Sequence, residues 1–211
     1  MKLALVRVEV VAMMVVATIT NLMLARFARY RTFWGWFGFI LGFDQLTKWW
    51  VVATIPYPTY HAGYGAGDPI RILGDAVWLV HVGNKGAAWG LGAGHPFTKL
   101  FLVGLALAVL LFVGLKRREL LRELAGGQIA FGLFVGGAIG NVIDRLFRDH
   151  VVDFVDIHLP FEVFGSDRWP AFNVADAAIC VGVALYFIFL WRQEREQRRR
   201  IVAQDGGKSV E

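Results

Sequence analysis

The chain has 211 residues, of which 56% are apolar, 14% aromatic and only 18% charged. Soluble domains carry roughly 45–50% apolar and about 25% charged residues, so this composition excludes a disordered chain, a coiled coil and a collagen-like repeat. The single cysteine, Cys180, excludes an intramolecular disulfide framework and a cysteine-rich metal site. We therefore expect one compact domain embedded in a membrane.

Residues 1–30 form an N-terminal extension to which the sequence assigns no role. Its apolar stretch, Val10–Leu24, is short for a membrane span, and Arg7 and Glu9 precede it. Three interpretations stay open: an extra marginal helix, an uncleaved signal-like segment, or a translation start placed too early, with Met23 as the true start. No clear small-residue site follows the stretch, which argues against cleavage.

Four later stretches are long enough to cross about 30 Å of hydrocarbon as helices. They are Phe33–Val52, Phe97–Leu115, Ala125–Val142 and Val174–Trp191. In the segment between the first two spans, Ile70–Leu73 and Val77–Val82 are β-prone runs separated by the turn signal Gly74–Asp75. We predict a mainly α membrane protein in which four transmembrane helices carry a small antiparallel sheet and a loop on the outer face.

The basic residues indicate the orientation of these spans. The net charge is +5, and most of the positive charge lies in three clusters at the ends of apolar runs: Arg26, Arg29 and Arg31; Lys116, Arg117, Arg118 and Arg122; Arg192, Arg195, Arg198, Arg199 and Arg200. This placement is typical of the positive-inside rule and puts all three clusters in the cytoplasm. No polar domain carries interleaved basic and aromatic residues, so a nucleic-acid surface is excluded. From Arg192 we expect a helical extension that frays, with residues 196–211 as a basic cytoplasmic tail.

Two ionisable residues lie inside the first span. Asp44 and Lys48 are four residues apart, so they share one helix face and can pair. Each costs roughly 2.5–3.5 kcal/mol to insert and needs a compensating interaction. They form either a purely structural ion pair or a polar patch that supports a site.

The third span has small residues at regular spacing and polar residues at its end. Gly132, Gly136 and Gly140 recur every four residues, which favours close approach of a neighbouring helix over nucleotide binding. At the helix end, Asn141, Asp144 and Arg145 lie on one side, where we expect them to satisfy one another and nearby backbone groups.

Carboxylates gather at one membrane face, and this pattern suggests acid–base chemistry. Two neighbouring carboxyl groups cannot both ionise cheaply, so one keeps a proton and the other acts as a base, as in aspartic peptidases. The eligible acids are Asp144, Asp153, Asp156 and Asp176, and their spacing does not choose the pair. Asp176 alone could merely complement a helix N-terminus.

Other catalytic chemistries find no support in the sequence. The five histidines are scattered, no HExxH or CxxC arrangement appears, and Ser166 and Ser209 are the only serines, neither in G-x-S-x-G. These residues therefore predict neither a metal site nor a serine nucleophile.

Five motifs, in order, resemble those of the lipoprotein signal peptidase (signal peptidase II) family, the bacterial membrane aspartic peptidases. They are DQLTK at Asp44–Lys48, NKGAAWG at Asn84–Gly90, GGAIGNVIDR at Gly136–Arg145, VVDF at Val151–Phe154 and FNVAD at Phe172–Asp176. The resemblance covers about Phe33 to Trp191. A longer stretch between the last two motifs, Leu159–Pro170, departs from the usual pattern.

The resemblance implies a catalytic pair, Asp153 and Asp176, and makes Asp144 structural. The residues it implies as supports around this pair and the substrate are Asp44, Lys48, Asn84, Gly137, Asn141, Arg145 and Asn173. The family uses no metal or organic cofactor and cleaves immediately before a diacylglyceryl-modified cysteine. The implied partners are the prolipoprotein and membrane lipid, and we expect a monomer.

The resemblance also implies a location, the bacterial cytoplasmic (inner) membrane, for a peptidase domain spanning 31–195. The active site would lie near the outer face, with both flanks of the four-helix core in the cytoplasm. Two other interpretations remain: a small transporter whose intramembrane acids relay protons, and a lipid-binding scaffold, which would need no acid pair.

Overall fold

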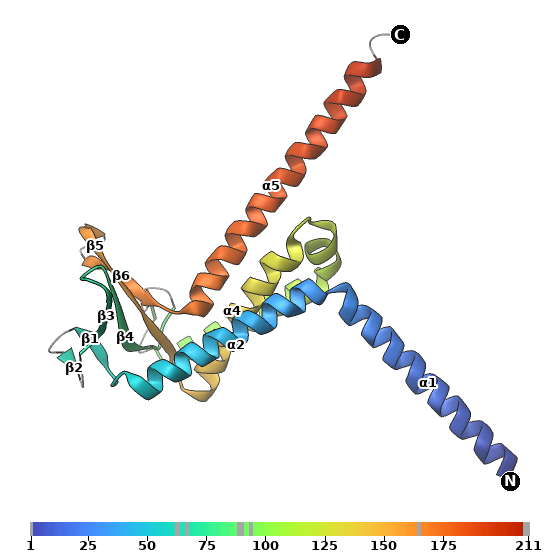
Figure 1. The fold of residues 1–211 in the computed structure, drawn as a ribbon, viewed down its shortest axis with the longest axis horizontal. Coiled ribbons are helices and arrows are strands. Elements are labelled where there is room, and N and C mark those ends of the chain that lie inside the picture. The colour runs from blue at the N-terminus through green and yellow to red at the C-terminus, as the bar shows by residue number, and fades with distance from the viewer. Residues whose placement is uncertain are drawn as a thin grey trace.

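The computed structural model describes residues 2–61, 64–65, 68–87, 91–92, 95–163 and 166–208. Its helices are α1 (Lys2–Arg29), α2 (Arg31–Thr54), α3 (Thr98–Leu115), the π-helical turn η2 (Glu119–Glu123), α4 (Gly127–Phe147) and α5 (Val174–Lys208). Its strands are β1 (Thr59–His61), β2 (Tyr64–Gly65), β3 (Ile70–Leu73), β4 (Val77–Asn84), β5 (Val151–Val163) and β6 (Ser166–Phe172). The strands lie together at one end of the helices, and both chain termini lie far from them (Figure 1).

In the described part of the chain, three helices are long and apolar enough to cross a membrane. They are Thr98–Leu115, Gly127–Phe147 and Val174–Gln204, which correspond to the second, third and fourth expected spans. The first expected span, Phe33–Val52, is helical within α2 but falls outside this class, because Asp44, Gln45 and Lys48 make it more polar. Length and composition therefore support three of the four expected spans.

The N-terminal extension is helical over its described residues. Helix α1 runs from Lys2 to Arg29 and joins α2 at Tyr30, where φ −114° and ψ 25° interrupt the helical geometry. It extends away from the other helices (Figure 1). At the other end of the chain, α5 continues without a break to Lys208, so the expected tail is helical as far as that residue. Residues 209–211 lie outside the described part.

Glycines allow α4 to pack closely between α2 and α5, as predicted. A Cβ atom on Gly132 would lie 2.7 Å from the Cβ atom of Trp36 on α2, and one on Gly136 would lie 3.0 Å from the carbonyl oxygen of Phe37. On the side facing α5, a Cβ atom on Gly137 would lie only 2.4 Å from the carbonyl oxygen of Ala175. A larger residue at these positions would collide with the neighbouring helix, so the absence of a side chain is what allows the helices to lie this close together.

The sheet is larger than the sequence predicted. In the described residues, six strands pair antiparallel in the order β2-β1-β4-β5-β6, and β3 also pairs with β4. The predicted strand Ile70–Leu73 and the turn after it are confirmed, while the second strand continues to Asn84. Strands β5 and β6 were not predicted.

The sheet is attached to the helices through a buried apolar cluster. Val51 and Ile55, at the end of α2, pack against Val152 and Phe154 of β5. In the same sheet, Val82 of β4 lies opposite Asp153. This attachment brings the first residues of β5, and with them Asp153, to the junction between the sheet and the ends of the helices.

Candidate active site

A cavity of about 610 Å³ lies where α3, α4 and α5 meet the sheet. Its walls are mostly apolar, and the polar side chains on it are those of Asn84, Asn141, Arg145, Asp153 and Asp176. The two carboxylates come from different elements, since Asp153 is on β5 and Asp176 is in the first turn of α5. The fold therefore brings the two acids that the family resemblance implied into one cavity.

The first turn of α5 is held by a reciprocal capping arrangement. The Oδ1 atom of Asn173 accepts a hydrogen bond from the backbone N–H of Asp176 (2.9 Å), and the Oδ2 atom of Asp176 accepts one from the backbone N–H of Asn173 (3.2 Å). These bonds satisfy two donors that a helix start leaves free. A third donor, the N–H of Ala175, bonds to Asp44 Oδ1 on α2 (2.9 Å). Asp176 thus serves the helix start and also faces the cavity.

Two asparagine side chains connect the carboxylates. Lys48 Nζ donates to Asn141 Oδ1 (3.0 Å), and because an ammonium group only donates, this contact orients the amide. The Nδ2 atom of Asn141 then donates to Asp176 Oδ1 (2.8 Å). The Nδ2 atom of Asn173 donates to Asp153 Oδ1 (2.7 Å). Each carboxylate is therefore held by an amide whose own position is fixed.

Lys48 is the centre of a fully buried charge cluster behind the cavity. Its Nζ atom lies 2.9 Å from Asp44 Oδ2 and 2.9 Å from Asp144 Oδ2, and none of the three side chains is exposed. Asp144 also pairs with Arg148 and accepts the backbone N–H of Val152 at 3.1 Å. The predicted Asp44–Lys48 pair is confirmed. The pair is joined through Asn141 to Asp176, so it is not a purely structural ion pair.

The four eligible acids fall into two classes. Asp144 pairs with Lys48 and Arg148, and Asp156 pairs with Arg168 on the neighbouring strand. Among the described residues, Asp153 and Asp176 have no such ion pair within 4 Å and face the cavity instead. The tertiary structure thus separates acids that spacing along the chain left equivalent.

The electrostatic environment of Asp153 favours its protonated form. Burial raises the pKa of this carboxyl group to about 7, and the nearby charge of Asp176 acts in the same direction. Hydrogen bonds from Asn84 and Asn173 and the charge of Lys48 oppose the increase. The neighbouring carboxylate of Asp176 therefore contributes to the raised pKa of Asp153.

Asn84 and Arg145 order the segment that follows β4. Asn84 Oδ1 accepts the backbone N–H of Gly86 (2.9 Å), and Asn84 Nδ2 donates to the carbonyl oxygen of Ala87 (3.3 Å). Arg145 Nη2 donates to the carbonyl oxygen of Gly86 (3.0 Å). Residues 88–90 of the NKGAAWG motif lie outside the described residues. Gly137, another predicted support, contributes no side chain to the site. Its lack of a Cβ atom makes room for the carbonyl oxygen of Ala175 on α5.

Sequence reasoning missed several residues of this region. Gln45 Nε2 donates to Asp44 Oδ2 (3.0 Å) and to the carbonyl oxygen of Gly140 (3.2 Å). Arg148 lies one helical turn after Asp144, so the i, i+4 spacing was a usable signal for that pair. The cavity wall made by Trp169 and Phe172 of β6 had no comparable signal, because that strand itself was not predicted.

Comparison with known proteins gives the family. The signal peptidase (SPase) II family matches residues 36–192, which include every residue of the site described above. The chain belongs to this family. It is therefore a membrane peptidase, and the transporter and scaffold interpretations are set aside.

Relatives of this signal peptidase II share most of its length. A lipoprotein signal peptidase of Nitratidesulfovibrio vulgaris is 38% identical over 173 residues, covering 81% of this chain and 95% of the relative. One from Anoxybacillus flavithermus is 37% identical over 155 residues, covering 74% and 82%. Among solved structures, a bacterial membrane enzyme has a TM-score of 0.56 at 30% identity, covering 75% of this chain and 87% of the other.

Proposed function

We propose that this signal peptidase II removes the signal peptide from diacylglyceryl-modified prolipoproteins, cleaving before the lipidated cysteine, with Asp153 and Asp176 activating water. The observation that carries the proposal is the presence of both carboxyl groups in one cavity, with the pKa of Asp153 raised to about 7. With this pKa, Asp153 keeps its proton in about half of the molecules at pH 7, and a protonated acid beside a second carboxyl group is the state that aspartic peptidase chemistry needs. No metal or organic cofactor enters this reaction.

The raised pKa of Asp153 indicates that this group holds the proton, since N–H donors contact both carboxylates. Asp176 accepts N–H donors from Asn141 and Asn173, an arrangement suited to a charged carboxylate. In the proposed reaction, Asp176 takes a proton from water as the water oxygen attacks the scissile carbonyl carbon. Protonated Asp153 donates its proton to the carbonyl oxygen, which gives a neutral tetrahedral intermediate. Asp153 then takes the hydroxyl proton back as Asp176 protonates the leaving amine of the cysteine, and the pair returns to its initial state.

Arg145 is the proposed contact for the peptide backbone. Its Nε atom is buried and, among the described residues, has no hydrogen-bond partner. The guanidinium group lines the cavity and is anchored through Nη2. A buried donor without a partner is costly, and a carbonyl oxygen of a bound peptide would satisfy it.

The proposed setting is the bacterial inner membrane, with α2 as the fourth span and the basic flanks in the cytoplasm. Asp176 precedes Trp191 by 15 residues, so it lies about 22 Å from the cytoplasmic end of the span at 1.5 Å per residue. In a hydrocarbon layer of about 30 Å this depth is near the outer edge. We propose a working monomer, since one chain supplies all of the polar side chains of the cavity.

The test is cleavage of a diacylglyceryl-modified prolipoprotein by the purified enzyme in lipid. We expect Asp153→Asn and Asp176→Asn each to lower the rate by roughly 10²–10⁴-fold, because each removes a group that moves a proton. Both variants should still fold and bind the substrate. Asp75→Asn is the control, since Asp75 is an exposed acid in the turn between β3 and β4. Full activity in either dyad variant would overturn the proposal.

A further inference from the structure

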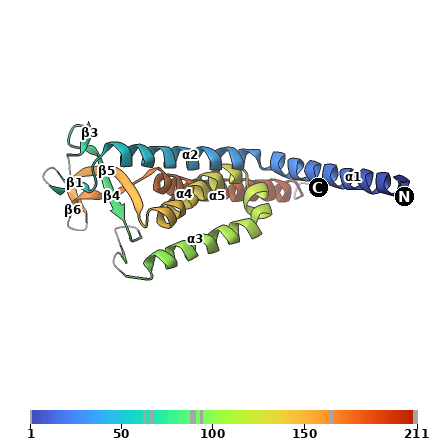
Figure 2. The same ribbon diagram turned by 90° about the horizontal axis from the view of Figure 1, so that it is seen from below.

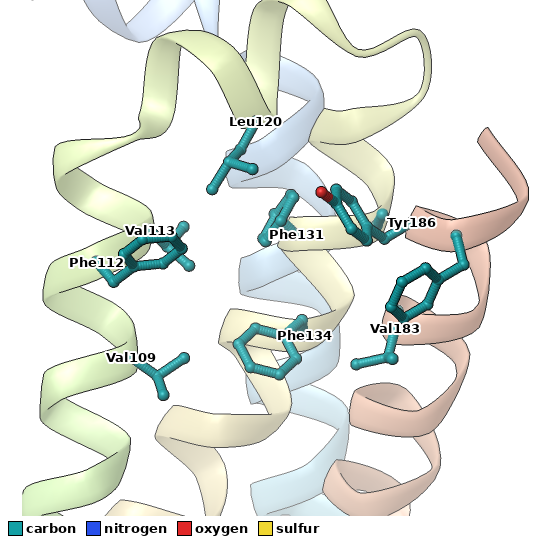
Figure 3. A pocket seen from close by; sticks show the side chains of 11 residues that line it. Val109, Phe112, Val113, Leu120, Phe131, Phe134, Val183 and Tyr186 are labelled. Carbon is teal, nitrogen blue, oxygen red and sulfur yellow. The ribbon is translucent and has the colours of Figure 1, made fainter. Parts of the chain in front are cut away.

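A second hollow, of about 260 Å³, lies among α3, α4 and α5 (Figure 3). Figure 3 shows Val109 and Phe112 of α3, Phe131 and Phe134 of α4, and Val183 of α5 around it. Apart from the hydroxyl group of one tyrosine, its side chains are hydrocarbon. This pocket has no polar group for catalysis, so its ligand must be apolar.

The pocket continues the active-site cavity along the same helix faces. On α5, Asp176 and Cys180 line the cavity, and Val183 and Phe187 line the pocket. The spacings of four, three and four residues place all four on one face of the helix. On α3 the same spacings join Leu102 and Ala106 of the cavity to Val109 and Val113 of the pocket. One apolar seam therefore runs from the carboxylates toward the cytoplasmic end of the helices.

The depth of this seam corresponds to one leaflet. Asp176 and Phe187 are 11 residues apart, which is about 16 Å along the helix at 1.5 Å per residue. Half of a hydrocarbon core of about 30 Å is about 15 Å, the depth that the acyl chains of one leaflet fill. A chain that begins at the carboxylates would therefore end within the pocket.

An acyl chain is also the apolar part of the substrate that can follow this seam. An α-helix with its side chains is about 10–12 Å wide, whereas a single acyl chain is narrower.

We propose that this pocket binds one acyl chain of the substrate's diacylglyceryl group. The inference rests on the proposed function, which places the lipidated cysteine beside the dyad, where the seam begins. A chain tethered there has a higher effective concentration at the pocket than a membrane lipid. Lipid tails are as apolar as the pocket, so an acyl chain gains little hydrophobic affinity by moving from the membrane into it. The pocket acts instead by fixing the position of the chain. A bound chain fixes the scissile bond relative to the carboxylates, and small misplacements at such a site lower rates strongly.

The test compares synthetic lipopeptides that differ only in having long or short acyl chains. Val183→Trp fills the pocket, and Val181→Trp is the matched control, since Val181 is 50% exposed on the same helix and lines neither hollow. We expect Val183→Trp to lower kcat/KM for the long-chain substrate by roughly tenfold to a hundredfold and to leave the short-chain substrate unchanged. Val181→Trp should change neither. Val109→Phe, which fills the pocket from α3, should reproduce the selective loss.

Cleavage of the short-chain substrate shows that each variant is folded. Equal losses for both substrates, or no loss for either, would overturn the acyl-chain site. If the wild-type enzyme cleaves neither lipopeptide, the proposed function fails instead.

Discussion

Asp153 is 2% exposed and lies beside a second carboxylate, and its pKa of about 7 has a consequence for stability. Between its ordinary pKa of 3.8 and about 7, the folded protein holds a proton that the unfolded chain has released. The free energy of unfolding therefore falls as the pH rises through this range. The burial that suits Asp153 for catalysis therefore lowers the free energy of unfolding at neutral and alkaline pH.

Replacing Asp153 by asparagine should remove this cost. We expect Asp153→Asn to raise the melting temperature by several degrees at pH 8, because each 1 kcal/mol shifts a chain of this size by roughly 2–4 °C. At pH 4 the carboxyl group is protonated in the folded state, so the variant and the wild type should melt together. Thermal unfolding of the purified protein in detergent measures both. A lower melting temperature for the variant at pH 8 would contradict the electrostatic account of this residue.

The sequence predicted individual site residues better than it predicted the residues with which they form ion pairs. The Asp44–Lys48 pair followed from helical spacing, and Arg148 could have been found beside Asp144 in the same way. Arg168 could not, because it reaches Asp156 only across the β5–β6 hairpin. Without these partners the acids remained equivalent, and the choice of Asp153 and Asp176 rested on the family resemblance.

At the scale of elements, the site depends on where α5 begins relative to α4. Gly137 permits this contact, since an added Cβ atom would lie 2.4 Å from the carbonyl oxygen of Ala175, directly before Asp176. We expect Gly137→Ala to displace the first turn of α5, to lower activity at least tenfold and to destabilise the fold by about 1–3 kcal/mol.

Gly42→Ala on α2 is the matched control for that substitution. A Cβ atom there would meet nothing within 4 Å, so the variant should keep full activity and should gain slightly in helix propensity. Cleavage assays and thermal unfolding of both variants give the comparison. Equal behaviour of the two would show that the close contact between α4 and α5 does not position the site.

Elements with a strong periodic or compositional signal were predicted, and the others were missed. Long apolar runs next to basic residues located α3, α4 and α5. The predicted ends agree with the observed ones to within about five residues, except that α5 continues as a helix to Lys208. Strands β5 and β6 were missed because Asp153, Asp156 and His158 interrupt the apolar residues of β5. These polar residues are tolerated since their partners come from other elements, such as Asn173 and Arg168.

At the scale of the whole molecule, the sheet and the basic end of α5 lie at opposite ends (Figure 2). In the proposed orientation, the basic clusters lie in the cytoplasm and the sheet faces the outside. In a Cys180→Ser background, which removes the only cysteine, we expect Asp75→Cys to react with an impermeant thiol reagent in intact cells with a permeable outer layer. Arg199→Cys should react only after the inner membrane is broken. The reverse pattern would contradict the proposed orientation.

In the proposed mechanism, Asp153 and Asp176 share one proton, and hydrolysis requires it. The pH dependence of kcat/KM on a diacylglyceryl lipopeptide tests this most directly, because it reports the ionisation of the free enzyme. The pKa of Asp153 predicts a rate that falls as the pH rises above about 7, approaching tenfold per pH unit. A rate that stays level through the alkaline range, with the enzyme still folded, would contradict the shared proton.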